Sequence, residues 1–102
     1  MFSLGYYQQL TKDDRIKWLK KQKAGTIIGD YRNQLYLVYK HIESKCHNSL
    51  QYCIYEQLFP EASWRGIYNP YEYCVELREL GYISILHTGS YHKLSIVKDL
   101  DF

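Results

Sequence analysis

Apolar side chains recur with helical spacing after Asp30, and this is the clearest pattern in the chain. The spacing is i, i+4, i+7, i+8 and i+11, with a cysteine one turn later, at Tyr31, Leu35, Val38, Tyr39, Ile42 and Cys46. Such a stripe is typical of an amphipathic helix that buries one face. We therefore expect a core helix that has Asp30 as its N-cap.

A weaker pattern predicts an earlier helix at residues 12–24. Thr11 and Asp14 have the spacing of a capping pair, and Gly25 suits the position just after a helix. The apolar stripe of this segment is narrow and consists of Ile16, Trp18 and Leu19. Three lysines fall on the opposite side, namely Lys17, Lys20 and Lys21.

A third, shorter helix is expected to begin at Asn48 or Ser49 and to end at Pro60. Its inward positions are Leu50, Cys53, Ile54 and Leu58. The segment 61–68 contains a glycine and is predicted to be a loop, with Trp64 and Ile67 holding it to the body of the protein.

The pair Asn69–Pro70 predicts the start of a fourth helix at residues 70–80. Asparagine is a favoured cap, proline is favoured at the first helical position, and Glu72 would complete a capping box. The buried stripe would consist of Tyr73, Cys74, Leu77 and Leu80. Gly81 then ends the helix.

After Gly81 the hydrophobic period changes from helical to that of strands. Two apolar runs flank a glycine-containing turn at 87–90, so residues 82–97 are predicted to form a β-hairpin. The helices and the hairpin should share one core cluster, at Leu35, Val38, Ile42, Leu50, Ile54, Leu77 and Leu80. A chain of 102 residues has room for one such core, so we expect a single domain over 1–102.

The expected order of elements resembles the winged helix-turn-helix superfamily over about residues 30–97. The segment Leu77 to Ile83 looks like the end of a recognition helix that runs into the first wing strand, and 87–90 looks like the wing tip. The resemblance implies a mostly helical α+β fold, with four helices followed by a C-terminal β-hairpin. Residues 12–24 would add a basic N-terminal helix to this winged-helix-like core.

The resemblance also implies a DNA-binding site. In such proteins the N-terminal part of the recognition helix reaches base edges in the major groove. The corresponding positions are Asn69, Tyr71, Glu72 and Val75. The wing would offer Tyr91, His92 and Lys93 to the DNA backbone or the minor groove.

Charge divides the chain into a basic and an acidic part. The net charge is +2, but residues 12–23 carry six basic and two acidic side chains, whereas 30–102 carries seven basic and nine acidic ones. Lys17, Lys20 and Lys21 could bind phosphates, or they could form an ordinary solvated helix face.

The predicted recognition helix is acidic, which counts against DNA binding because phosphate neutralisation supplies much of the affinity. Its carboxylates are Glu72, Glu76 and Glu79. We therefore keep two hypotheses. The first is a DNA-binding regulator of transcription or of a mobile element such as a phage or virus. The second is a protein-interaction module or inhibitor that docks through these glutamates without binding DNA. The 12 tyrosines suit either a core rim or a binding surface.

No motif of catalytic chemistry is present, and we expect a protein that is not an enzyme and has no cofactor. His41, His47 and the three cysteines are residue types that bind zinc, but their spacings match no common zinc motif. We expect Cys46, Cys53 and Cys74 to be reduced, metal-free core residues. The chain lacks a membrane-length apolar run and a signal-peptide pattern, so we expect a cytoplasmic protein. A homodimer could form through apolar residues outside the main stripes, at Tyr36, Leu37 and Phe102.

Overall fold

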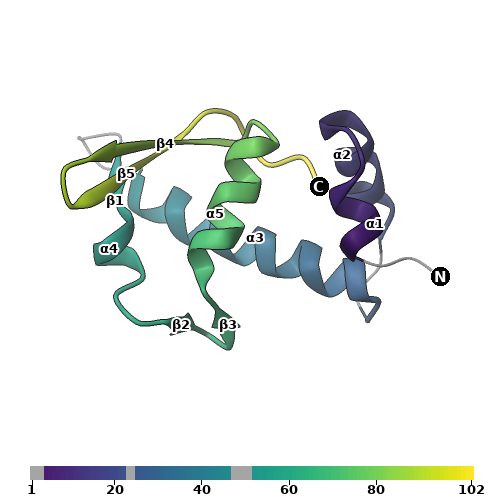
Figure 1. Ribbon diagram of the computed structural model, residues 1–102, viewed down its shortest axis with the longest axis horizontal. Helices are drawn as coiled ribbons and strands as arrows, with labels where there is room; N and C mark the ends of the chain where they lie inside the picture. Colours follow the sequence, from purple (N-terminus) through teal and green to yellow (C-terminus); the bar gives the residue numbers. More distant parts are fainter. Residues whose placement is uncertain (1–3, 23–24, 47–51) are drawn as a thin grey trace.

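The computed structural model describes residues 4–22, 25–46 and 52–102 (Figure 1). About half of the chain is helical and a small antiparallel sheet accompanies the helices, which makes the molecule an α+β domain. The helices are α1 (Leu4–Gln8), α2 (Lys12–Lys21), α3 (Ile27–Cys46), α4 (Tyr55–Leu58) and α5 (Pro70–Glu79). The strands are β1 (Cys53–Ile54), β2 (Ser63–Trp64), β3 (Ile67–Tyr68), β4 (Ile83–Thr88) and β5 (Tyr91–Ile96).

The two helices predicted in the N-terminal half of the chain are confirmed as α2 and α3, although each begins or ends at residues other than the predicted ones. Thr11 caps α2 as expected, because its hydroxyl accepts a hydrogen bond from the Asp14 amide at 3.3 Å. Helix α3 begins at Ile27, so Asp30 lies in its first turn and is not the cap. The cap role falls to Thr26, whose hydroxyl accepts a hydrogen bond from the Gly29 amide at 2.7 Å.

The prediction of a third helix up to Pro60 is wrong for most of the segment that the structure describes. Cys53 and Ile54 form strand β1, which pairs with β5, and only the single turn of α4 follows. A strand forms here because β5 offers an unpaired edge, and hydrogen bonding along that edge outweighs a local helical pattern. The expected cap residues Asn48 and Ser49 lie outside the described residues, as does Leu50.

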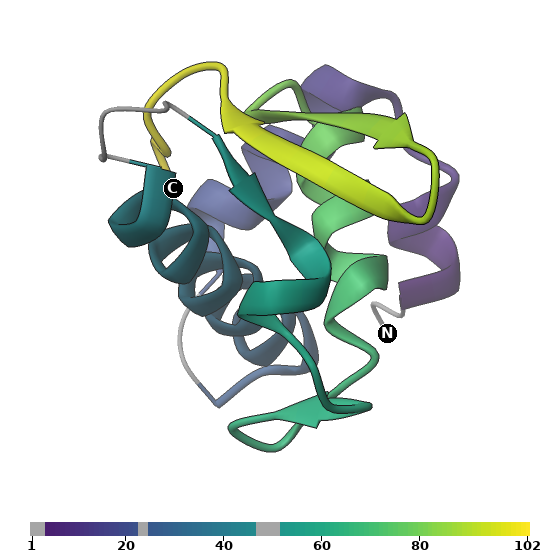
Figure 2. The same ribbon diagram turned by 90° about the vertical axis from the view of Figure 1, so that its left-hand side faces the viewer.

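The C-terminal hairpin is confirmed, and β1 extends it to a three-stranded sheet in the order β1-β5-β4. The hairpin register runs from Ile83 opposite Ile96 to Thr88 opposite Tyr91. Figure 2 looks toward this sheet, with α3 and α5 packed behind it. The turn at Gly89 has a φ of 58°, a conformation that glycine adopts without strain.

The segment before α5 is more ordered than the predicted loop. Strands β2 and β3 form a small hairpin whose turn has positive φ at Arg65 and Gly66. Trp64 is half-buried and Ile67 is buried, so both hold the segment to the body as predicted. The Asn69 amide donates to the Ala62 carbonyl at 2.8 Å and thereby closes the hairpin.

Closing that hairpin changes how α5 begins. Asn69 has a φ of 53° and makes no side-chain cap, so the predicted capping box with Glu72 does not form. The Asn69 carbonyl accepts from the Glu72 amide at 3.1 Å instead. Pro70 occupies the start of the helix as expected, and Gly81 follows its end with a φ of 89°.

The core lies between α3, α5 and the sheet. Five of the predicted core residues are completely buried, namely Leu35, Val38, Ile42, Leu77 and Leu80. Ile54 is only half-buried because it belongs to β1 and not to a helix. Three tyrosines are also fully buried, at Tyr7, Tyr39 and Tyr82. Within the described residues, no helix combines the length and the apolar character that spanning a membrane requires.

Candidate functional site on helix α5

Helix α5 lies between the β4–β5 hairpin and the N-terminal helices, and its sides differ accordingly (Figure 1). Pro70, Cys74 and Leu77 are buried toward α3 and the sheet. Glu72 and Glu79 are exposed on the outward side. The two flanks of the helix, one toward the hairpin and one toward α1 and α2, have different polar neighbours.

On the hairpin side, Tyr71 packs into an aromatic group. Its ring centroid lies 5.0 Å from that of His92 on β5 and 5.2 Å from that of Tyr55 on α4. His87 stacks on His92 across the hairpin at 4.6 Å. These rings hold the first turn of α5 against the hairpin.

Glu56 of α4 also binds His92 of the hairpin. Its carboxylate accepts a hydrogen bond from the His92 amide at 2.9 Å and lies 2.7 Å from Nδ1 of the His92 ring. Burial raises the pKa of Glu56, but the contacts with His92 outweigh that effect and hold the pKa below its usual value. His92 is thus a structural link between α4 and β5.

The other two hairpin residues proposed to contact DNA, Tyr91 and Lys93, differ in their exposure. Tyr91 is exposed next to the hairpin turn, whereas Lys93 is half-buried with Nζ 4.6 Å from the ring centroid of Tyr52. Lys93 therefore forms a cation–π contact within the protein.

On the opposite flank, Arg15 of α2 pairs with Glu76 of α5. Arg15 Nη1 lies 3.0 Å from Glu76 Oε1, and the guanidinium also donates to the main-chain oxygens of Gln8 at 2.6 Å and Leu10 at 3.1 Å. Only 20% of the Arg15 side chain and 10% of the Glu76 side chain are exposed. This ion pair anchors the N-terminal helices to α5.

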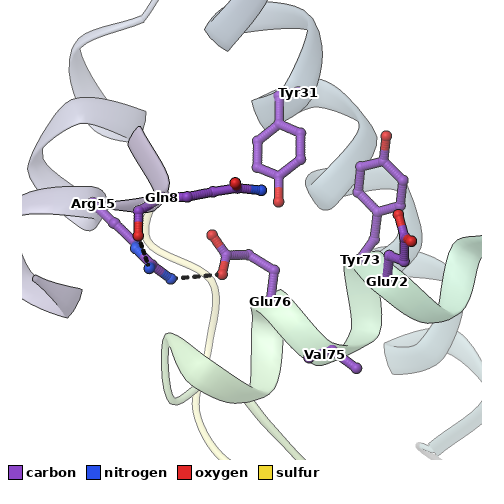
Figure 3. Close-up of a pocket in the computed structure, with 7 residues that line it drawn as sticks. All are labelled: Gln8, Arg15, Tyr31, Glu72, Tyr73, Val75 and Glu76. Carbon is purple, nitrogen blue, oxygen red and sulfur yellow. Dashed lines mark hydrogen bonds and ion pairs between the residues drawn. The ribbon is translucent and has the colours of Figure 1, made fainter. Parts of the chain in front are cut away.

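A cavity of about 580 Å³ opens beside this ion pair (Figure 3). It lies between the N-terminal helices, α3 and α5, and its walls are formed by Gln8, Arg15, Tyr31, Glu72, Tyr73, Val75 and Glu76. Burial and the Glu76 carboxylate raise the pKa of Tyr31 well above its usual value. The Tyr73 hydroxyl donates to the Gln34 side chain and is thereby held in place.

The three lysines proposed to bind phosphates are all exposed, but they do not form one patch. Lys17 and Lys21 line the same shallow cavity of about 220 Å³ on α2, together with Asp14. Lys20 lies nearer the C-terminus, where its Nζ is 3.6 Å from Asp101. Two of the three are thus available together.

The glutamates proposed to dock a protein partner are also divided. Glu72 and Glu79 are exposed, and Arg78 lies 3.0 Å from Glu79. Glu76 is 8% exposed and turned toward Arg15, so it is not part of the outward acidic surface.

The cysteines are buried in the core, as expected. Cys46 and Cys53 have their sulfurs 3.0 Å apart, and burial raises the pKa of both thiols. Burial alone raises the pKa of Cys74 to about 12. Within the parts of the chain that the structure describes, no cluster of three or more metal-ligating side chains occurs. His41 instead stacks on Trp64 at 4.7 Å.

Of the residues considered for a homodimer interface, Tyr36 and Leu37 are exposed on α3. Phe102 is half-buried and packs against Tyr82 with ring centroids 5.5 Å apart.

Sequence reasoning missed the pairing of Arg15 with Glu76 and the cavity beside it. The only available signal was an arginine among the lysines of α2, since arginine is favoured over lysine in buried ion pairs. No protein-family model, curated protein or solved structure matches this chain.

Proposed function

We propose that this chain is a winged-helix protein that binds double-stranded DNA, as a regulator of transcription or of a mobile element. The observation that carries the proposal is the order of elements. Helix α5 is followed directly by the β4–β5 hairpin and lies beside it with an outward face, and before α5 come α3, strand β1, the single turn of α4 and the short strands β2 and β3. A helix that leads into a β-hairpin is the part of this order that supports the resemblance to winged helix-turn-helix domains; α5 would be the recognition helix and 87–90 the wing tip.

The base-reading residues would be those at the start of α5. Tyr71 is held by Tyr55 and His92, which limits its motion and would lower the entropy cost of a contact with a base. Asn69 is half-buried next to it. Amide side chains such as that of asparagine can make a bidentate contact with adenine.

Phosphate contacts would come mainly from the N-terminal helices, because the outward face of α5 is acidic. Lys17 and Lys21 are exposed together on α2, and Tyr91 is exposed near the wing tip. These side chains would contact phosphates of the DNA backbone on the two sides of α5.

The test is binding of the full chain to random duplex DNA over a range of salt concentrations. A DNA-binding protein should lose affinity steeply as salt rises, with a slope of about −0.9 for each phosphate contact. Absence of binding even at low salt would contradict the proposal.

Neutralising Lys17, Lys20 and Lys21 together should weaken binding to all sequences and flatten the slope by about two units, because Lys20 lies apart from the other two, beside Asp101. A matched control neutralises three lysines elsewhere, Lys40, Lys45 and Lys98, and changes the net charge equally. If both triple variants lose affinity equally, net charge and not α2 is responsible. Changing Tyr71 should alter sequence preference instead.

One observation favours a second candidate, a module that docks a basic protein partner. Glu72 and Glu79 are exposed on α5, and three of the residues proposed to contact DNA are engaged within the protein, namely Tyr71, His92 and Lys93. Reversing the charges of Glu72 and Glu79 should then abolish capture of a partner while the fold is kept. Glu76 must stay unchanged because it is buried against Arg15.

A further inference from the structure

Two of the three buried cysteines lie in contact with each other. The sulfur of Cys46, in the last turn of α3, is 3.0 Å from the sulfur of Cys53 on β1. A disulfide holds its two sulfurs about 2.05 Å apart, so an approach of about 1 Å separates the present contact from a covalent bond. The pair is therefore close enough for oxidation to join the two thiols.

Regular secondary structure holds both thiols at this position. Cys53 lies opposite Leu94 in the antiparallel register of β1 and β5. The Cys46 sulfur lies 3.4 Å from the main-chain oxygen of the same Leu94, which is fully buried. The two sulfurs are thus held against each other by the end of α3 and by the sheet, and the contact belongs to the core.

The thiols differ in acidity and in exposure. Burial raises the pKa of both Cys46 and Cys53, but the contact between them lowers the pKa of Cys46 and raises that of Cys53. Cys46 is therefore the thiol that ionises first, and the thiolate is the reactive form in oxidation. Cys46 is 7% exposed, whereas Cys74 on α5 is fully buried. A small oxidant thus reaches Cys46 more easily than Cys74.

We propose that Cys46 and Cys53 are a peroxide-sensitive thiol pair that is converted to a reversible disulfide. The Cys46 thiolate attacks one oxygen of hydrogen peroxide, the O–O bond breaks, and the departing hydroxide takes up the proton that Cys46 released. Cys46 is then a sulfenic acid. The Cys53 sulfur attacks the Cys46 sulfur, the S–O bond breaks, and the hydroxyl group leaves as water with the Cys53 proton. Two thiols and one peroxide give one disulfide and two water molecules.

The bond ties the end of α3 to β1 and, through β1, to β5. It closes a loop of eight residues, 46–53, and so restricts the unfolded chain. The urea midpoint of the oxidised protein should therefore lie about 1–2 M above that of the reduced protein. In protein that is kept with a reductant and not oxidised, all three thiols stay free. The proposal does not depend on DNA binding.

The test is treatment of the reduced full chain with hydrogen peroxide in small molar excess, followed by alkylation with iodoacetamide in urea. The protein should lose the mass of two hydrogen atoms, one cysteine should still accept the alkyl group, and dithiothreitol should restore all three thiols. Chymotryptic cleavage after Leu50 or Tyr52 should leave the Cys46 and Cys53 peptides joined. Failure to form a disulfide, a link that includes Cys74, or oxygen added to the cysteines without a disulfide would overturn the proposal.

Variants assign the bond to its two cysteines. Cys46→Ala and Cys53→Ala should each abolish both the disulfide and the rise of the urea midpoint on oxidation. The matched control Cys74→Ala should keep both effects, because Cys74 takes no part in the bond. The proposal is wrong if Cys74→Ala prevents the disulfide, or if the oxidised parent unfolds at a lower urea concentration than the reduced parent. Peptide mapping of the parent protein decides the pairing even if a variant does not fold.

Discussion

Replacing Arg15 with methionine should lower the free energy of unfolding by about 3 kcal/mol. Methionine keeps much of the apolar stem, but it leaves the Glu76 carboxylate buried without the cation that now lies 3.0 Å away. Removing one partner of a buried ion pair typically costs about 3–5 kcal/mol. The side chains of Arg15 and Glu76 are 20% and 10% exposed, so the pair is not completely buried. The expected loss of unfolding free energy therefore lies at the lower end of that range.

Urea unfolding followed by circular dichroism measures this loss. With a slope of about 1–3 kcal/mol per molar urea, the midpoint should fall by about 1–3 M. The matched control is Arg78→Met, because Arg78 forms an equally short pair with Glu79, at 3.0 Å, in which both side chains are largely exposed. That control should cost less than about 1 kcal/mol.

A double variant separates the ion pair from packing. Arg15→Met combined with Glu76→Gln removes the buried charge and should recover at least about 1 kcal/mol relative to Arg15→Met alone. The reasoning is refuted if Arg15→Met costs no more than Arg78→Met. It is equally refuted if the double variant is less stable than Arg15→Met.

Three further predictions concern the core, the thiols and the C-terminal segment. Leu77→Ala should lower the free energy of unfolding by about 2–4 kcal/mol because Leu77 is fully buried. Leu86→Ala, at a 59% exposed position, should lower it by less than about 0.5 kcal/mol. Equal losses in urea unfolding would show that Leu77 does not lie in the core. Native intact-mass measurement should show that the three cysteines are reduced and metal-free. Because burial raises the pKa of their thiols, iodoacetamide should modify them far more slowly in the folded protein than in urea. A disulfide, a bound metal or equal rates of modification would contradict this prediction. A hydrogen bond from Tyr82 lowers the pKa of Asp101. At neutral pH the parent protein should therefore be more stable than the Asp101→Asn variant, and this difference in stability should disappear as the pH falls below about 4. A difference that does not depend on pH would mean that the carboxylate charge plays no part.

The sequence predicts the elements whose signals are local. The stripe from Tyr31 to Cys46 and the change of period at Gly81 each lie within one segment, and α3 and the hairpin formed where those patterns placed them. Strand β1 was missed because its partner is remote: Cys53 lies opposite Leu94. A helical pattern of a few residues could not show that an edge of β5 would be available.

The candidate site shows the same division. Exposure of Lys17 and Lys21 follows from their place on α2 opposite Leu19, which is buried. Glu76 could not be told from Glu72 or Glu79 by its position in the sequence, because its burial depends on Arg15, 61 residues earlier in the chain. Whether a side chain at the border between the core and solvent is buried depends on the element that packs beside it.

Nuclear magnetic resonance mapping of the ¹⁵N-labelled chain, titrated with a short random DNA duplex at low salt, tests the proposed DNA interface most directly. Bound DNA should shift the amide signals of α2, of the first turn of α5 and of the wing tip at 87–90, because phosphate and base contacts would lie there. The signals of the buried face of α3 should stay in place. A titration that leaves all signals unchanged, or that shifts only residues away from α2, α5 and the β4–β5 hairpin, would contradict the proposal that this domain binds DNA.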